Sequence, residues 1–399
     1  MAEPVIVATS RTPIGRANKG SLTDARPDDL SAATIGDVID KAGVDADLIE
    51  DVIWGCGQPG GEAGYNVARV AALLAGVDAP GVTVNRYCSS SLQTIRMAAH
   101  AVKAGEGDCF VAGGVETVSR YLNGAADTGP HNEAFADAES RTATRSERGA
   151  DQWSDPAGLP DIYIAMGQTA ENVVQLTGIS RERQDEFGVL SQNRAEDALN
   201  RGFFEREITP YTLPDGTVVR TDDGIRAGTT IEKVRELKPV FRPDGTVTAG
   251  NACPLNDGAA AVVVMSDTKA ADLGLTPLAR IVASGVSSLH PEIMGLGPIE
   301  AIRQALGRAG KTIDDIDLVE INEAFAVQVL GSADELAIPL DKLNVNGGAI
   351  ALGHPFGMTG ARIMTTLLNG LEDADKEWGV ESMCVGGGQG MAMVVQRLN

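Results

Sequence analysis

Cys88 is the first residue whose type and position suggest chemistry. It lies in segment 85–91, NRYCSSS, directly before a helical pattern over Leu92–Ala104. Unpaired backbone N–H groups and the positive end of that helix would face the thiol, lower its pKa and favour the thiolate. The alternative interpretation is a small buried cysteine beside a serine-capped helix start.

His354 is the second candidate, in the glycine-rich segment 347–357, GGAIALGHPFG. So many glycines allow close backbone approach to a ligand, or a sharply bent loop. The dipeptide Val-Asn comes shortly before both His354 and Cys88, which stand 266 positions apart. A twofold relation between two repeated halves would bring both helix starts to one interface, where the histidine could activate the thiol. A hydrogen-bonded loop histidine is the alternative.

Two further polar residues stand at predicted strand ends. Cys384 precedes segment 385–390, VGGGQG, whose glycines leave backbone N–H groups accessible, as an oxyanion hole requires. Asn322 follows the predicted strand Leu318–Ile321, at the edge where open α/β sheets bind ligands. The alternatives are a cysteine beside a tight turn and a helix N-cap.

Short apolar runs alternate with amphipathic stretches in the elements that would position these residues. The predicted strands and helices of the first half are Val5–Ala8, Asp28–Ala42, Asp51–Trp54, Gly81–Val84, Leu92–Ala104 and Cys109–Val111. This alternation predicts βαβ units and a mostly parallel, buried sheet. Similar segments recur 267 positions apart at 41–52 and 308–319, and 274 apart at 110–114 and 384–388. The recurrence predicts an ancient duplication that gives two α/β core domains.

The segment between the two halves differs from them in composition. Residues 118–249 include the polar stretch Tyr121–Asp161, a charged helical pattern over Arg181–Phe203 and a basic stretch over Val218–Phe241. We expect an inserted, mainly helical domain here, after which the strand Ala259–Met265 returns to the first core. The predicted division is therefore 1–117 completed by 250–272, then the insertion 118–249, then 273–399.

The composition excludes several classes of function. The net charge of −22 and the 4% aromatic content argue against binding to nucleic acid, and the charge also argues against binding to anionic lipid headgroups. The five cysteines lack CxxC spacing and the four histidines lack ligand spacing, so we expect neither a disulfide scaffold nor a metal site. No signal peptide or membrane span is evident, which predicts a cytoplasmic α/β protein.

The segments around Cys88, Asn322, His354 and Cys384 resemble, in their order along the chain, the signatures of the thiolase family. The resemblance extends over essentially the whole chain. Segment 85–93 resembles the nucleophile motif, and Asn322–Ala326, Asn344–Gly357 and Cys384–Gly390 resemble the three C-terminal signatures. Further matching segments are 113–116, 166–172, 250–258 and 294–298. The resemblance implies the α/β thiolase fold, with two duplicated core domains layered αβαβα and an inserted loop domain that binds coenzyme A (CoA).

The resemblance also implies a role for each residue. Cys88 would carry the acyl group, His354 would be its base, and Cys384 would exchange the α-proton. Asn322 would hold the enolate oxygen through a water, and the N–H of Gly386 would complete the oxyanion hole with that of Cys88. Substrate and CoA contacts are implied at Arg226, Cys253, Met166, Met294 and Phe325. The enzyme would need no cofactor, since CoA is a substrate, and would be a dimer or a dimer of dimers acting in fatty acid β-oxidation.

Three departures from the family pattern concern substrate binding. Cys253 replaces a serine that contacts pantetheine, Ala165 stands where acetoacetyl-specific members often carry histidine, and Ser91 replaces a glycine. Acyl chain length and the physiological direction are therefore open. The alternatives to a thiolase are a ketoacyl-synthase-type condensing enzyme and a non-catalytic CoA or lipid carrier of the same fold.

Overall fold

The computed structural model describes residues 2–121, 129–148 and 152–399, and a mixed ten-stranded sheet runs through it. Its order is β10-β11-β12-β9-β1-β8-β5-β3-β4, with the short β2 (Gly15–Arg16) beside β8. The first half supplies β1 (Pro4–Arg11), β3 (Asp51–Cys56), β4 (Gly81–Val84), β5 (Cys109–Thr117) and β8 (Asn256–Ser266). The second half supplies β9 (Ala279–Ser288), β10 (Leu318–Ile321), β11 (Trp378–Val385) and β12 (Gln389–Arg397).

The strand order has twofold symmetry about the junction of β1 and β9. Outward from that junction, β8, β5 and β3 on one side match β12, β11 and β10 on the other, with the same relative directions. Even β4, parallel to β3, has a counterpart in Leu343, which bridges Val319 of β10 in parallel. This symmetry agrees with the predicted duplication.

The prediction of a mostly parallel sheet is wrong. Among the described strands, only β3–β4, β3–β5 and β10–β11 pair in parallel. The other described pairs of this sheet are antiparallel, among them β5–β8 and β11–β12, which stand at equivalent places in the two halves. Each half of the sheet is covered on both faces, so its strands are as apolar as the strands of a parallel sheet.

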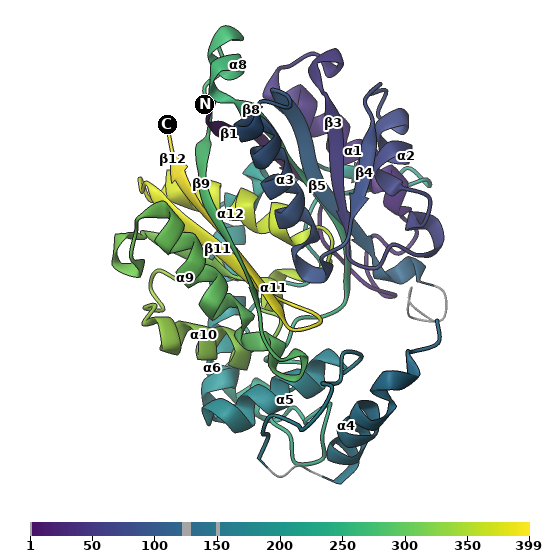
Figure 1. Cartoon of the computed structure of the whole chain (residues 1–399), viewed down its shortest axis with the longest axis vertical. Coiled ribbons are helices and arrows are strands. Elements are labelled where there is room, and N and C mark those ends of the chain that lie inside the picture. Colours follow the sequence, from purple (N-terminus) through teal and green to yellow (C-terminus); the bar gives the residue numbers. More distant parts are fainter. Residues whose placement is uncertain (1, 122–128, 149–151) are drawn as a thin grey trace.

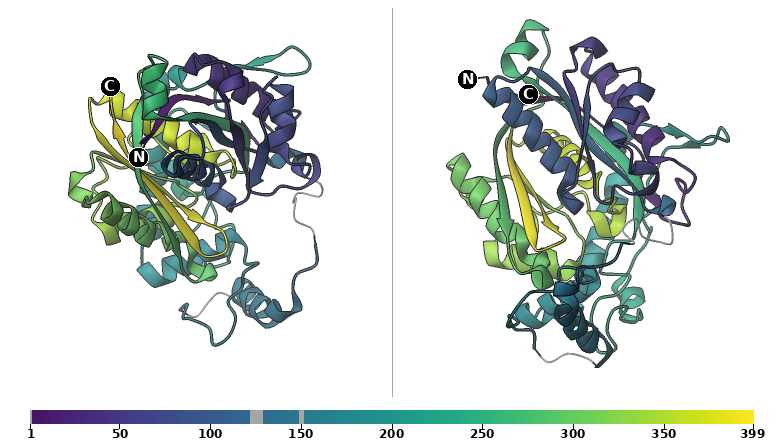
Figure 2. Two further views of the ribbon diagram at one scale, coloured as in Figure 1. Left: turned by 45° about the horizontal axis from the view of Figure 1, so that its top comes forward. Right: turned by 45° about the vertical axis from the view of Figure 1, so that its right-hand side comes forward.

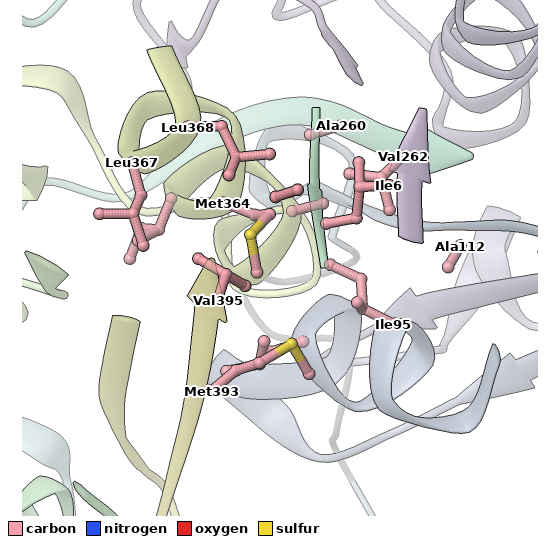
Figure 3. Close-up of a cluster of buried hydrophobic side chains, with 14 of the residues drawn as sticks. Ile6, Ile95, Ala112, Ala260, Val262, Met364, Leu367, Leu368, Met393 and Val395 are labelled. Atoms are coloured by element: carbon pink, nitrogen blue, oxygen red, sulfur yellow. The ribbon is translucent and has the colours of Figure 1, made fainter. Parts of the chain in front are cut away.

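Helices and sheet halves alternate in five layers, as the αβαβα prediction requires. Helices α1 (Pro27–Ala42) and α2 (Val67–Leu74) pack on the outer face of the first half, and α9 (Gly297–Ala309) and α10 (Ala326–Leu336) on that of the second. Helices α3 (Ser90–Ala104) and α12 (Thr359–Asp373) lie between the two halves. Figure 3 shows this central layer, where Met364 of α12 and Ile95 of α3 meet Val262 and Met393 of the two sheet halves.

The starts of α3 and α12 touch each other. Ala361 N donates to Ser91 Oγ at 2.9 Å, and a Cβ on Gly360 would lie 2.3 Å from the backbone nitrogen of Leu92. This close approach requires glycine at position 360, and it brings the residues before the two helices together.

Between β5 and β8 the chain forms a largely helical segment beside the two halves (Figure 1). It contains α4 (Ala136–Arg148), α5 (Met166–Thr177), α6 (Arg181–Asn200), α7 (Ile231–Arg235) and the hairpin β6 (Tyr211–Thr212)–β7 (Val218–Val219). Within the predicted insertion, residues 122–128 and 149–151 lie outside the described residues. Both views in Figure 2 keep the purple-to-blue first half and the green-to-yellow second half on separate sides.

Two short helices complete the chain, α8 (Asp267–Asp272) after β8 and α11 (Ala349–Leu352) before His354. Every helix of the described residues is too short or too polar to cross a bilayer.

We expect Gly360→Ala to lower the free energy of unfolding by about 1–3 kcal/mol or more, because the new methyl group would overlap the α3 backbone. Gly307→Ala in α9 is the matched control, since a Cβ there meets no atom within 4 Å. The control should be neutral or stabilising by up to about 1 kcal/mol. Urea denaturation of both variants measures the difference, and equal stability would contradict the contact.

Candidate active site

A tight turn before α3 sets the position of Cys88. Tyr87 has a left-handed backbone (φ 41°), and its N–H donates to Asn85 Oδ1 at 2.8 Å. The Ser90 hydroxyl donates to the carbonyl oxygen of Tyr87 at 2.7 Å. A non-glycine residue in this region stores strain, which the surrounding hydrogen bonds must hold. The turn therefore fixes Cys88 at the entrance of α3 rather than leaving it on a loop.

Cys88 lines a pocket of about 270 Å³ and is itself 9% exposed. The walls are mainly apolar and aromatic and come from the turn before α3, the segment before α5, the His354 loop and the turn after β11. The other lining residues are Gln58, Tyr87, His131, Ile162, Tyr163, Ile164, Ala165, Met166, Phe356, Gly386 and Gly387.

The prediction of a lowered thiol pKa at Cys88 is wrong for this structure. Burial raises the pKa of Cys88 to about 11, and the nearby carboxylate of Glu116 raises it further. Backbone N–H groups of Gly386 and of Cys88 itself stabilise the thiolate, but they offset only part of the cost of burial. The resting group is therefore a thiol, which needs a base to become a nucleophile.

Cys384 comes to the same place from the second half. It is the second-last residue of β11, lies opposite Gly390 of β12 and is fully buried. Burial raises the pKa of its thiol, and the neighbouring thiols of Cys88 and Cys253 raise it further. The three sulfur atoms therefore lie close enough to influence one another's charge.

A glycine turn connects Cys384 to β12 and presents the N–H of Gly386 to the Cys88 sulfur. Gly388 has φ 77°, and a Cβ there would lie 2.2 Å from the Leu289 carbonyl oxygen. Arg86 Nη1 donates to Gln389 Oε1 at 2.8 Å, which ties this turn to the turn before Cys88.

The hydrogen bonds of His354 determine its tautomer. The Thr359 hydroxyl donates to the Pro355 carbonyl at 2.8 Å, so it accepts from Nδ1 of His354 at 2.7 Å. Nδ1 thus carries the proton, and the lone pair of Nε2 faces the amide of Asn322, 3.3 Å from its Nδ2. Burial lowers the pKa of His354 to about 3, with a further contribution from the positive charge of Arg362, so the ring is neutral.

Asn322 follows β10 as predicted, and its position is fixed from both sides. Its N–H donates to Ser382 O of β11 at 2.9 Å, and its side-chain amide reaches the His354 ring. Within the described part of the chain, its buried Oδ1 accepts no hydrogen bond. A buried acceptor without a protein donor can be satisfied by a bridging water.

Phe356 links His354 to the Cys88 pocket. Its ring meets that of His354 edge-on, with centroids 5.1 Å apart, and it also lines the pocket. Together with the contact between the starts of α3 and α12, this places the predicted Cys88, His354, Asn322, Cys384 and Gly386 around one buried site.

Two acidic residues, Glu116 and Glu323, have a positioning role that was not predicted from the sequence. The carboxylate of Glu116 accepts N–H groups of Gly57 at 2.8 Å and Gly357 at 2.8 Å, so it binds the His354 loop to the first half. Glu323 accepts the Ser191 hydroxyl at 2.6 Å and the N–H of Ile350 at 3.1 Å, and so holds the turn before His354. A carboxylate inside or directly after an apolar strand was the signal that could have found both.

The five predicted CoA contacts lie in different surroundings. Met166 lines the Cys88 pocket, and the half-buried Cys253 lies near the sulfur atom of Cys88. Arg226 is exposed, on a loop whose backbone N–H donates to Gln192 Oε1 at 2.8 Å. Met294 and Phe325 are buried in the apolar cluster of the second half and do not line the pocket among the described residues.

This geometry combines a buried cysteine thiol at a helix entrance with a neutral histidine and a second buried thiol, an arrangement that suits an enzyme with a cysteine nucleophile. Residues 4–268, which include the inserted segment, match the model of the thiolase N-terminal domain, and residues 275–397 match that of the C-terminal domain. Similarity to known proteins covers the same span.

The 3-ketoacyl-CoA thiolase of Bacillus subtilis is 42% identical over 99% of this chain and 100% of its own length. A β-ketoadipyl-CoA thiolase of Acinetobacter baylyi and an acetyl-CoA acetyltransferase of Cupriavidus necator are each 43% identical over the full length of both chains. The crystal structure of the Bacillus anthracis acetyl-CoA acetyltransferase superposes with a TM-score of 0.87 at 38% identity, covering 100% of this chain and 99% of that one.

The chain belongs to the thiolase family. The sequence-based predictions of the family, of the thiolase fold and of thiolase activity are thereby confirmed.

We expect Thr359→Val to lower kcat by about tenfold or more, because the isosteric side chain no longer accepts the Nδ1 proton that fixes the tautomer. Thr359→Ser keeps the hydroxyl and should retain most of the activity. Melting temperatures show whether both variants fold. Wild-type kcat in Thr359→Val would contradict the positioning role.

Proposed function

We propose that the protein transfers acyl groups between CoA and acetyl-CoA, with Cys88 as the acyl carrier. The substrates are a 3-ketoacyl-CoA and CoA in thiolysis, or two acyl-CoA molecules in Claisen condensation. The observation that carries this proposal is the meeting of Cys88, from the first half, with Cys384 and the Gly386 N–H, from the second.

In thiolysis, His354 Nε2 takes the proton of Cys88 as its sulfur attacks the ketone carbon. The bond between that carbon and the α-carbon breaks, and the acyl group stays on Cys88 as a thioester. The departing enolate of acetyl-CoA takes a proton from Cys384. The CoA thiol then gives its proton to the Cys384 thiolate as the CoA sulfur attacks the thioester carbon. The bond between that carbon and the Cys88 sulfur breaks, and Cys88 takes back the proton held by His354.

The charges of the site favour this order of events. A buried thiol with pKa about 11 and a buried imidazole with pKa about 3 are both neutral at rest, so negative charge develops only with bond making. The N–H groups of Cys88 and Gly386 converge on the Cys88 sulfur, next to the thioester oxygen of the acyl-enzyme. Fixed donors in a dry site stabilise such a charge strongly.

A carbanion beside a thioester also needs a donor for its oxygen. His354 and a water held by the buried Oδ1 of Asn322 support that role. The chemistry uses only the chain's own side chains and requires no cofactor.

The lining of the Cys88 pocket also favours a substrate whose acyl chain is uncharged and longer than acetyl. Its walls are apolar, and Ala165 leaves room where a larger residue would close it. No arginine or lysine lines it among the described residues, and its His131 is already paired with Glu139 at 2.9 Å. Burial of a chain-end carboxylate there would lack a partner.

Thiolysis of two six-carbon substrates tests this specificity. We expect kcat/KM for 3-ketohexanoyl-CoA to exceed that for 3-oxoadipyl-CoA by about tenfold or more, since they differ in a terminal methyl against a carboxylate. Loss of the ketoacyl thioester, followed by absorbance, gives both values. A preference for 3-oxoadipyl-CoA would overturn the assignment, and decarboxylation of malonyl-CoA would favour the ketoacyl-synthase alternative.

We also infer the setting in which the enzyme works. Arg226, Cys253, Met166, Met294 and Phe325 are proposed CoA contacts, and exposed Arg226 suits the phosphates of the nucleotide end. The edge strand β4, with exposed Tyr65, Leu73 and Leu74 beside it, supports a homodimer or a dimer of dimers. The cytoplasm and fatty acid β-oxidation are the proposed location and pathway.

Two cysteine variants separate the half-reactions. Cys88→Ala should lose both acylation and carbon–carbon bond chemistry, because no other group carries the thioester. Cys384→Ala should still take one acetyl group from acetyl-CoA, but lose thiolysis and condensation by roughly 10²–10⁴-fold. It should also lose exchange of acetyl α-hydrogens with deuterated solvent.

Intact-mass and peptide analysis after brief incubation with acetyl-CoA locates the acetyl group. Cys109→Ala is the control, since this thiol is buried at the start of β5 in the apolar cluster of the first half and lies outside the proposed chemistry. Acetylation of any residue other than Cys88 would overturn its role. Exchange at the wild-type rate in Cys384→Ala would show that this thiol is not the acid/base.

A further inference from the structure

A second pocket, of about 350 Å³, lies between the side of α3 and β9. Arg96, His100 and Lys103 line it from one face of α3, at helical spacing, and Arg308 lines it from the last turn of α9. The remaining lining residues are Ala99, Ile281, Val282, Ala283, Ser284 and Met393. Four basic side chains thus surround one cavity in a chain of net charge −22.

Within the part of the chain that the structure describes, no acidic side chain balances these four basic groups. Among the described residues, none of the four basic side chains forms an ion pair with a carboxylate, and no carboxylate lines the pocket. The positive charges act on one another instead. Burial and then Arg86 and Arg308 lower the pKa of Arg96, and burial and then Arg96 and Lys103 lower that of His100. Such a cluster attracts an anion.

Neutral acceptors on β9 hold the basic head groups around the cavity. Arg96 Nε donates to Ser284 Oγ at 3.2 Å, Arg308 Nη1 to the Ser284 carbonyl at 2.5 Å, and Lys103 Nζ to the Val282 carbonyl at 3.4 Å. Each guanidinium and ammonium group has further N–H donors than these bonds use. Two guanidinium forks with an ammonium group match the oxygens of phosphate groups.

We propose that this pocket binds a small anion with two or more linked phosphate groups. The cavity of about 350 Å³ has room for more than one phosphate group, and two guanidinium groups with an ammonium group carry more positive charge than a monovalent anion neutralises. The site is separate from the Cys88 pocket, since the two share no lining residue. CoA also carries a pyrophosphate, so the test must separate this pocket from the Arg226 loop.

Isothermal titration calorimetry of the full-length protein with sodium pyrophosphate, in phosphate-free buffer of low ionic strength, measures binding. We expect saturable binding to the wild type and at least about tenfold weaker binding to Arg96→Gln/Lys103→Gln, equivalent to about 1.4 kcal/mol. Arg183→Gln/Arg206→Gln is the matched control, because it removes the same charge from exposed ion pairs with Asp334 and Asp373. It should bind like the wild type.

Three results of the calorimetry would each overturn the proposal. These are no saturable binding to the wild type, equal weakening in both double variants, or loss of binding in Arg226→Gln with retention in Arg96→Gln/Lys103→Gln. The last would assign the phosphate site to the Arg226 loop. Thiolysis by each variant is followed separately, so failure of the proposed catalytic function is distinguishable from failure of this site.

His100 supplies an independent readout of location. A bound polyphosphate offsets the neighbouring cations, so it should raise the pKa of His100 in a ¹³C-detected histidine titration. The His100→Gln variant identifies the resonance. Saturable calorimetric binding with an unchanged His100 titration would place the anion elsewhere and overturn the proposal.

Discussion

The active site depends on the contact between the starts of α3 and α12 in the middle layer. Cys88 precedes one helix and His354 precedes the other, and the two helices occupy equivalent places in the two halves. Gly360 lets the helices approach to backbone distance at Leu92. The first turns of α3 and α12 are buried, and a close-packed, nearly incompressible interior can hold reacting groups far more rigidly than surface loops can.

Burial determines how this site works as well as where it lies. In water, a thiol and an imidazole would share a proton readily; here burial raises the pKa of Cys88 and lowers that of His354, so the uncharged pair is favoured. Charge separation then becomes favourable only where backbone N–H groups meet the developing oxyanion. The same low-dielectric surroundings that make the resting thiol inert strengthen those donors when substrate is bound.

Much of the fold and site could be predicted from the sequence, because the signals were local or repeated. Glycine-rich turns marked Cys384 and His354, and the repeat paired His354 with Cys88 across 266 positions. The strand directions could not be read, since strands buried on both faces are equally apolar whether parallel or antiparallel. The pKa of Cys88 was predicted in the wrong direction, because its burial comes from Phe356 and the turn at Gly386, both distant in sequence.

The division of the site between two halves explains the buried polar contacts at their boundary. Within the described strands, β1 and β9 pair at only two positions, Val5 with Arg280 and Ile6 with Ala279, too few to fix one half against the other. Cys88 belongs to the first half, while its proposed base His354, the proposed oxyanion donor Gly386 and the second thiol belong to the other. Glu116 and the Arg86–Gln389 pair cross this boundary next to the reacting sulfur. A shift of about 1 Å between reacting groups can cost 10²-fold in rate, so these polar anchors serve catalysis more than they serve overall stability.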